Sequence, residues 1–154
     1  MGIAVERHIG IVSAMTDRTR WDALLEGDYD IPANDNLGFE RHSVSAPKER
    51  VSFSWTAPPE YSNSAGNLQG GMLAAFADAL LGGASAAHLP DDRYPALAEM
   101  KISIFRPVPA GTRLTGTGYV VKAGRRVLFA EAEITDEHGK LIAKASATEI
   151  PADA

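Results

Sequence analysis

The sequence predicts an α+β domain in which one long helix lies against an antiparallel sheet. Apolar and polar residues alternate in several separate segments, which is typical of half-buried strands. Residues 72–89 instead have the length and composition of a helix. The later strands are joined by short connections, and such connections link antiparallel neighbours, whereas parallel strands need a long crossover. The chain has 154 residues, of which 45% are hydrophobic and 23% charged, and this suits a single globular domain.

The first 36 residues are expected to form an N-terminal appendage to a main domain at residues 37–154. Residues 16–25 fit a short helix, because their apolar side chains fall on one side of a helical turn pattern. The stretch DYDIPANDN that follows is rich in turn-forming residues and is expected to be a loop. Nothing in the sequence of this appendage indicates its role.

Strands are predicted on both sides of the helix. The first contains residues 51–55, and the strands after the helix have their apolar positions at 100–104, 114–121, 128–134 and 141–147. The connections between the later strands are PVPAG, KAGR and DEHG, so we expect a meander in which each strand pairs with the next. The aromatic residues Phe53, Trp55 and Phe129 are expected in the core.

The composition argues against several classes of function. There are 15 Lys and Arg against 20 Asp and Glu, and a net charge of −5 argues against general binding of nucleic acid. No apolar run approaches the roughly 18 residues that cross a membrane, and charges interrupt the N-terminal segment where a signal peptide would be apolar. A cytoplasmic protein is therefore expected. Because there is no Cys and the His residues have no paired spacing, no metal site is expected.

The predicted helix has two different faces. At about 100° per residue, Leu73, Phe76 and Leu80 share one arc, which we expect to lie on the sheet. Asp78 points almost the opposite way and is the only charged residue between positions 72 and 89. Its neighbours at helical spacing are all small, namely Gly71, Ala74, Ala75, Gly82 and Ser85. A ligand or a second subunit is therefore expected to approach this face, since a solvent-exposed stripe would ordinarily carry more charges.

Gly70 and Gly71 stand where the helix is predicted to begin. The N–H groups of a first helical turn have no partner within the helix and lie at the positive end of its dipole. Such donors can stabilise negative charge on a carbonyl oxygen, as in an oxyanion hole. The simpler alternative is that the glycine pair only permits a tight turn into the helix.

Several short motifs follow one another in a fixed order between residues 37 and 150. They are Asn63, Gly66, Gln69-Gly70-Gly71, Leu73 with Asp78, Ile104-Phe105-Arg106-Pro107, Gly124-Arg125-Arg126, and Asp136 to Gly139 followed by Lys140, Leu141 and Ala143. In this order and spacing the chain resembles the hotdog-fold acyl-CoA thioesterases, in particular the PaaI-like branch of the phenylacetate pathway. The resemblance implies a curved antiparallel sheet wrapped around one central helix. It also implies a homodimer, or a dimer of dimers, with each active site shared between two subunits.

The resemblance further implies roles for single residues. The family's acidic catalytic residue falls on Asp78, which either attacks the thioester carbonyl or activates water as a general base. The N–H that polarises the carbonyl falls on Gly70, and the polar group that holds water or substrate falls on Asn63. In the family the Asp comes from the subunit opposite the Gly and Asn. Gln69, which can still donate a hydrogen bond to a carbonyl, replaces a family His, and Leu97 replaces a Ser or Thr.

A second set of residues is expected to bind the substrate. It consists of Gly71 at the helix start and the cations Arg106, Lys122, Arg125 and Arg126, which with Arg113 are interpreted as a local cationic cluster. Guanidinium groups suit the phosphates of coenzyme A, although cations at hairpin tips are often only solvated. Coenzyme A is expected as part of the substrate and not as a cofactor.

The predicted function is therefore hydrolysis of an aliphatic or aryl acyl-CoA thioester, with an acyl-CoA as the expected partner and neither nucleic acid nor membrane. A carboxyl group among Ala and Gly is expected to have a raised pKa, which would make it a better base near neutral pH. The sequence leaves open the acyl group and the choice between coenzyme A and acyl carrier protein. A non-catalytic acyl-thioester-binding protein, a hotdog hydratase or dehydratase, and a structural oligomerisation domain are the alternatives.

Overall fold

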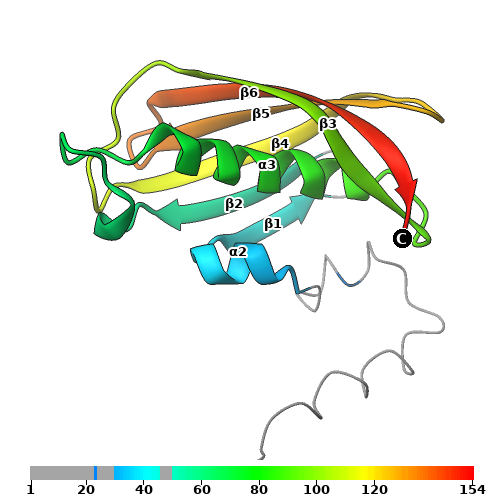
Figure 1. Ribbon diagram of the computed structural model, residues 1–154, viewed down its shortest axis with the longest axis horizontal. Coiled ribbons are helices and arrows are strands. Elements are labelled where there is room, and N and C mark those ends of the chain that lie inside the picture. Colours follow the sequence, from blue (N-terminus) through cyan, green and yellow to red (C-terminus); the bar gives the residue numbers. More distant parts are fainter. Residues whose placement is uncertain (1–22, 24–29, 46–49) are drawn as a thin grey trace, which may run out of the picture.

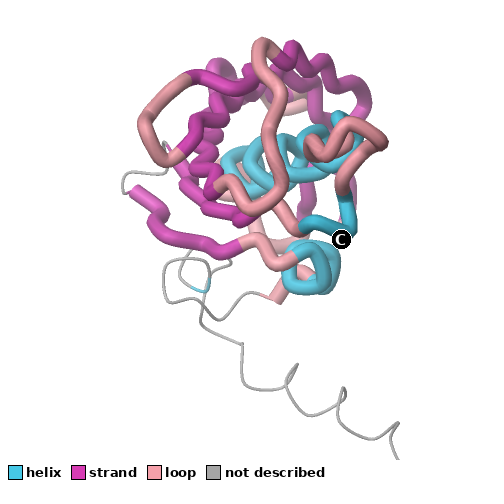
Figure 2. Tube along the Cα trace, turned by 90° about the vertical axis from the view of Figure 1, so that its left-hand side faces the viewer, coloured by secondary structure: helices cyan, strands magenta, loops and turns pink. Residues whose placement is uncertain are grey.

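The computed structural model describes residues 30–45 and 50–154, together with Ala23. An antiparallel sheet of six strands curves around the long helix α3 (Gly70–Ala86), and Figure 2 shows the strands surrounding this helix. The strands are β1 (Glu40–Ser45), β2 (Arg50–Thr56), β3 (Arg93–Ile104), β4 (Arg113–Ala123), β5 (Leu128–Asp136) and β6 (Leu141–Asp153) (Figure 1). Two short helices, α2 (Pro32–Leu37) and η2 (Pro59–Tyr61), complete the described elements. The predicted α+β class and the curved sheet around one helix are confirmed.

The strand order across the sheet is β1-β2-β4-β5-β6-β3, so the expected meander is correct only for β4, β5 and β6. β3 pairs with β6 and not with β4, although only residues 105–112 connect β3 to β4. This connection crosses the end of the sheet beside the start of α3, where the Leu68 N–H donates to the Val108 carbonyl at 2.7 Å (Figure 1). The rule that short connections join neighbours fails here because the curvature of the sheet brings the ends of β3 and β4 towards each other around the helix.

The core lies between the concave face of the sheet and α3. Leu73, Phe76 and Leu80 are buried as predicted. Phe76 and Phe39 pack together with Trp55, whose indole N–H donates to the Leu37 carbonyl at 2.8 Å. Burial of these apolar side chains is the main force that holds the helix in the sheet.

Phe129 lies outside this core, contrary to expectation. It alternates along β5 with the buried residues Leu128 and Ala130, so it points to the outer face of the sheet and is 42% exposed. The alternation itself decides this outcome, because adjacent residues of a strand point to opposite faces.

The stretch that was expected to be a loop contains α2. Pro32 stands at the start of this helix, and Gly38 ends it with a φ of 75°, a left-handed conformation that glycine adopts without strain. Leu37 packs against the core, so the boundary expected at residue 36 passes through an element that contacts the sheet. The helix expected at residues 16–25 lies outside the described residues apart from Ala23. In the described part of the chain, no helix is long and apolar enough to span a membrane.

Two glycines of β4 bring the strand very close to α3. A Cβ atom at Gly118 would lie 2.3 Å from the backbone oxygen of Leu80, and one at Gly116 would lie 2.3 Å from Leu80 Cδ1. Real Cβ atoms essentially never approach other atoms this closely, so only glycine fits at this spacing. The two positions fix the depth of α3 in the sheet and thereby the positions of the residues along it.

Candidate functional site

The start of α3 presents the glycine pair that the sequence singled out. Gln69 precedes the helix in an extended conformation, and its carbonyl accepts the Met72 N–H at 2.9 Å. The N–H groups of Gly70 and Gly71 therefore belong to the first turn, where the helix itself offers no acceptor. Gly71 is exposed, and a Cβ there would meet nothing within 4 Å, so an incoming group has access to this turn. The Gln69 side chain is also exposed and makes no capping hydrogen bond.

Asn63 lies in the loop that leads into this turn. Its side-chain oxygen accepts the Ala65 N–H at 2.9 Å and the Asn67 N–H at 3.2 Å, which holds the loop in shape. Gly66 occupies a φ of 76° in the same loop. The side-chain oxygen of Asn63 is thus used to shape the loop, and its exposed NH2 group is the part suited to a substrate contact.

Asp78 lies in the middle of α3 and is exposed, between buried Ala77 and half-buried Ala79. Its side chain reaches solvent, yet partial burial raises the pKa of Asp78 above its ordinary value, as expected. Around it Ala74, Ala75 and Gly82 are only half-buried, in agreement with a face open to close approach. Ser85 was expected on this open face, but it is 0% exposed and is covered by the sheet.

The structure separates the cations that were interpreted as one cluster. Arg106 lies at the end of the sheet where α3 begins, and its guanidinium donates to the Leu141 carbonyl. Arg113 lies at the same end in an ion pair of 2.8 Å with Glu40. Lys122, Arg125 and Arg126 are exposed at the opposite end of the molecule, in and beside the β4–β5 hairpin (Figure 1).

The length of β4 keeps these two groups of cations apart by roughly 30 Å. The prediction of a single cluster within one chain is therefore wrong. All these cations lie at or near strand ends, but the strand ends are divided between the two ends of the sheet. Within one chain, the hairpin arginines therefore lie far from Gly70.

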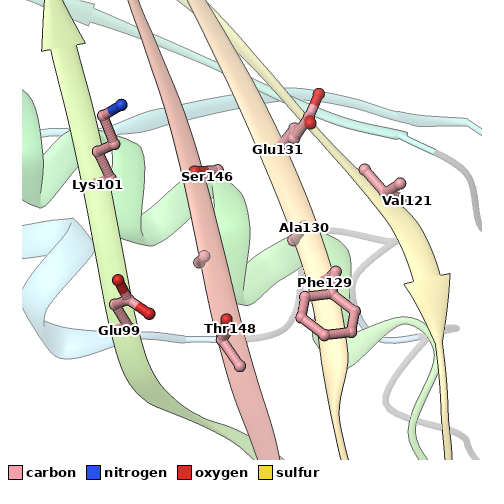
Figure 3. A pocket seen from close by; sticks show the side chains of 9 residues that line it. Glu99, Lys101, Val121, Phe129, Ala130, Glu131, Ser146 and Thr148 are labelled. Atoms are coloured by element: carbon pink, nitrogen blue, oxygen red, sulfur yellow. The ribbon is translucent and has the colours of Figure 1, made fainter.

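The outer face of the sheet carries two shallow grooves, and neither includes a predicted site residue. Figure 3 shows the first of them, which crosses the sheet from Glu99 and Lys101 on β3, past Thr148 on β6 and Phe129 on β5, to Val121 on β4. α3 lies on the other side of the sheet. Among the described residues, no group of three or more His, Asp and Glu could hold a metal ion.

A buried carboxyl group, Glu149, was missed by the sequence analysis. It faces α3 from β6, is 1% exposed, and lies opposite Leu97 of β3 and Leu128 of β5. Neither of its oxygens makes a hydrogen bond of good geometry among the described residues, and the buried Ser85 hydroxyl, which is close enough to act on this carboxyl group, makes none either. The available signal was the inward alternation Ala143, Ala145, Ala147 along β6, which places the next inward side chain at Glu149.

Burial raises the pKa of Glu149 to about 7. The Ser85 hydroxyl acts in the opposite direction, and the negative charge of Asp78 raises the value further. Near neutral pH the carboxyl group of Glu149 is therefore close to its midpoint, and below that pH it holds a proton.

The raised pKa makes stability depend on pH. Between pH 4.5, the ordinary pKa, and pH 7, the unfolded chain has released a proton that the folded protein keeps, so the free energy of unfolding falls as pH rises. The rise of the pKa from 4.5 to about 7 corresponds to a change of about 3 kcal/mol in the free energy of unfolding. Glu149→Gln is expected to remove this fall, so its stability relative to the natural protein increases from pH 4.5 to pH 8. Urea unfolding at both pH values checks this, with Glu99→Gln on the outer face as control; parallel pH dependence in all three proteins would contradict it.

Comparisons with known proteins agree with this fold. A model of the family described as "Thioesterase superfamily" matches residues 65–143. Acyl-coenzyme A thioesterase 13 of Mus musculus is 25% identical over 135 residues, which cover 86% of this chain and 94% of that protein. The solved structure of a phenylacetic acid degradation-related protein from Ralstonia eutropha JMP134 is similar with a TM-score of 0.77 and 29% identity, covering 84% of this chain and 98% of that chain. The protein smu.793 from Streptococcus mutans UA159, solved bound to acetyl CoA, has the same fold with a TM-score of 0.68 and 20% identity, covering 75% and 89% of the two chains.

Proposed function

Because the chain belongs to the thioesterase superfamily and is a thioester hydrolase, we propose that it hydrolyses acyl esters of coenzyme A to the free acid and coenzyme A. The family match confirms the resemblance on which the sequence analysis relied. The observation that carries the proposal is Asp78, the one charged residue of α3, which has a raised pKa and small neighbours along its face of the helix.

The proposed reaction uses Asp78 together with the start of α3. The thioester carbonyl oxygen accepts the Gly70 N–H, which stabilises the negative charge that develops during attack. Asp78 either attacks the carbonyl carbon or takes a proton from the attacking water. Gln69 and the NH2 group of Asn63 donate hydrogen bonds that orient the carbonyl or the water, and Gly71 leaves room for the acyl group.

The spacing along α3 supports a site shared by two chains. Gly70 and Asp78 are separated by eight residues, which is about 12 Å along a helix axis. A carbonyl oxygen and carbon are bonded neighbours, so one chain cannot supply both groups to the same thioester. We infer a homodimer in which Asp78 of one chain faces Gly70 of the partner subunit, with the small face of α3 in the contact.

The choice of coenzyme A as carrier rests on the mouse relative and on the cations. That relative is named an acyl-coenzyme A thioesterase, and smu.793, which shares the fold, is bound to acetyl CoA. The exposed Arg125 and Arg126 of one chain can approach the partner's site from the hairpin, where their guanidinium groups suit phosphates. Arg106, which is already bonded to Leu141, and Lys122 are the weaker candidates for this contact.

The proposal is tested by measuring thiol release from a panel of aliphatic and aryl esters. Each acyl group is offered on coenzyme A, on pantetheine and on acyl carrier protein. Release from the coenzyme A esters is expected, and the preferred ester identifies the acyl class. Release only from acyl carrier protein esters would replace the proposed carrier, and no release from any ester would overturn the proposed reaction.

Replacing both Arg125 and Arg126 by Ala is expected to raise the KM for coenzyme A esters roughly tenfold, because two phosphate contacts are lost. The kcat and the KM for pantetheine esters are expected to stay unchanged, since those substrates lack the nucleotide. Steady-state kinetics with the two carriers checks this, and Lys101→Ala, an exposed cation on the outer face, is the matched control. An equal effect on both carriers would remove the phosphate assignment.

A further inference from the structure

The side chain of Ile104 lies against Gly70 at the start of α3. Ile104 is the last residue of β3, and a Cβ atom at Gly70 would lie 3.3 Å from Ile104 Cδ1. The end of the Ile104 side chain therefore leaves little room beyond the glycine itself. Ile104 is nevertheless 43% exposed, so the rest of its apolar surface is open to an incoming group beside Gly70.

The contact lies on the side of Gly70 towards which its N–H group points. In an α-helix each Cα–Cβ bond is tilted towards the N-terminus of the helix. The N–H groups of the first turn point the same way and have no acceptor within the helix. Ile104 Cδ1, which lies close to the Cβ position of Gly70, is therefore beside the place where an oxygen would accept the Gly70 N–H.

The side chains that continue from Ile104 along the inner face of β3 are also apolar. Ile102 and Met100 share this face, because alternate residues of a strand point to the same side. Both are half-buried against the core, and neither offers a hydrogen-bond donor. The pantetheine arm of coenzyme A contains amide groups, which would lose their hydrogen bonds to water beside such side chains, whereas an acyl chain has none to lose. The acyl group is thus the part of a thioester that suits this row.

We propose that Ile104 is a specificity-determining residue that selects acyl groups without branches at the α-carbon, the carbon bonded to the thioester carbonyl. The inference rests on the proposed function, in which the Gly70 N–H holds the carbonyl oxygen. The α-carbon lies about 2.4 Å from that oxygen, so its substituents are held beside Ile104. An unbranched chain is only one methylene group wide at this point, but an α-carbon with two methyl branches needs space that Cδ1 occupies.

Two isomeric acyl groups on coenzyme A test the inference. One is unbranched and the other has two methyl groups on the α-carbon, and both have the number of carbons that the natural protein releases fastest. The natural protein is expected to prefer the unbranched isomer. Ile104→Val removes Cδ1 and keeps the rest of the side chain, so the ratio of kcat/KM for the branched isomer to that for the unbranched isomer should rise roughly tenfold. Ile104→Ala should raise the ratio further.

The ratio separates selectivity from a general structural effect. Both isomers are measured on the same variant, so a loss of stability or of active protein cancels, and so does the lower intrinsic reactivity of the branched ester. Ile150→Val is the matched control, because Ile150 is 50% exposed and alternates on β6 with buried Glu149 and Pro151, which places it on the outer face. This control should keep the natural ratio.

The same measurements on pantetheine esters identify which part of the substrate touches Ile104. The change in isomer ratio is expected to be equal on both carriers. A change in the preference between carriers with an unchanged isomer ratio would place the carrier arm at Ile104 and overturn the inference. A natural preference for the branched isomer, or folded Ile104→Val and Ile104→Ala with the natural ratio, would overturn it too. Thiol release by the natural protein would support the proposed function in each of these cases, whereas no release from any ester would overturn that function and the inference with it.

Discussion

Asp78→Asn is expected to lower the rate of thiol release at least about a hundredfold. The amide is nearly isosteric with the carboxylate, but it can neither attack the thioester nor accept a proton from water at neutral pH. Because Asp78 reaches solvent and no described hydrogen bond depends on it, the substitution should leave the fold intact. Single-turnover thiol release, with circular dichroism as a check of folding, measures the effect. Asp92→Asn, an exposed aspartate in the turn before β3, is the matched control.

The same variant tests whether the site is shared. Gly70→Pro removes the backbone donor, and proline is well tolerated at the first position of a helix that follows an extended residue such as Gln69. Each variant alone is expected to be inactive. A heterodimer of the two contains one site with both Asp78 and Gly70 intact, so an equal mixture should regain about a quarter of the natural activity. A mixture that stays inactive after subunit exchange, or Asp78→Asn that keeps more than a tenth of its activity, would contradict the proposed site.

Local sequence patterns were sufficient to predict the strands and the helix that depend only on residues close to one another in the sequence. The two-residue period around Phe53 identified β2, and the 3.6-residue period placed Leu73, Phe76 and Leu80 on the buried side of α3. These patterns are reliable because burial on one side of a strand or helix acts on each residue separately. Asp78 was visible for the same reason, as a single charge on a face of small residues.

What the sequence analysis missed depends on the curvature of the whole sheet. The pairing of β3 with β6 follows from the wrapping of the sheet around α3, which no short segment encodes. The cations looked like one cluster because strand ends alternate between the two ends of the sheet, and a linear sequence does not separate these ends. Glu149 was overlooked because the predicted strand stopped at Ala147, one inward position too early.

The close approach of β4 to α3 leads to the largest expected effect on stability. Gly118→Ala is expected to destabilise the fold by about 3 kcal/mol, because the new methyl group would overlap the backbone oxygen of Leu80. A backbone atom in the middle of a helix cannot rotate away, so α3 must move out of the sheet and separate its buried side chains from their partners. Urea unfolding measures the loss, with Thr115→Ala on the exposed side of the same strand as the control.

Gly116→Ala distinguishes this explanation from a general intolerance of β4 to substitution. Its methyl group would meet Leu80 Cδ1, the end of a side chain that can change rotamer, although Phe76 at 3.1 Å limits the space. We therefore expect Gly116→Ala to cost less than Gly118→Ala, and Leu80→Ala to relieve the clash at Gly116 but not at Gly118 in the double variants. If both glycine variants lost the same stability, or if Leu80→Ala restored the stability of Gly118→Ala, the backbone contact would not set the depth of α3. Since Asp78 precedes Leu80 by only two residues, the same contact positions the carboxylate, and a folded Gly118→Ala should lose activity as well as stability.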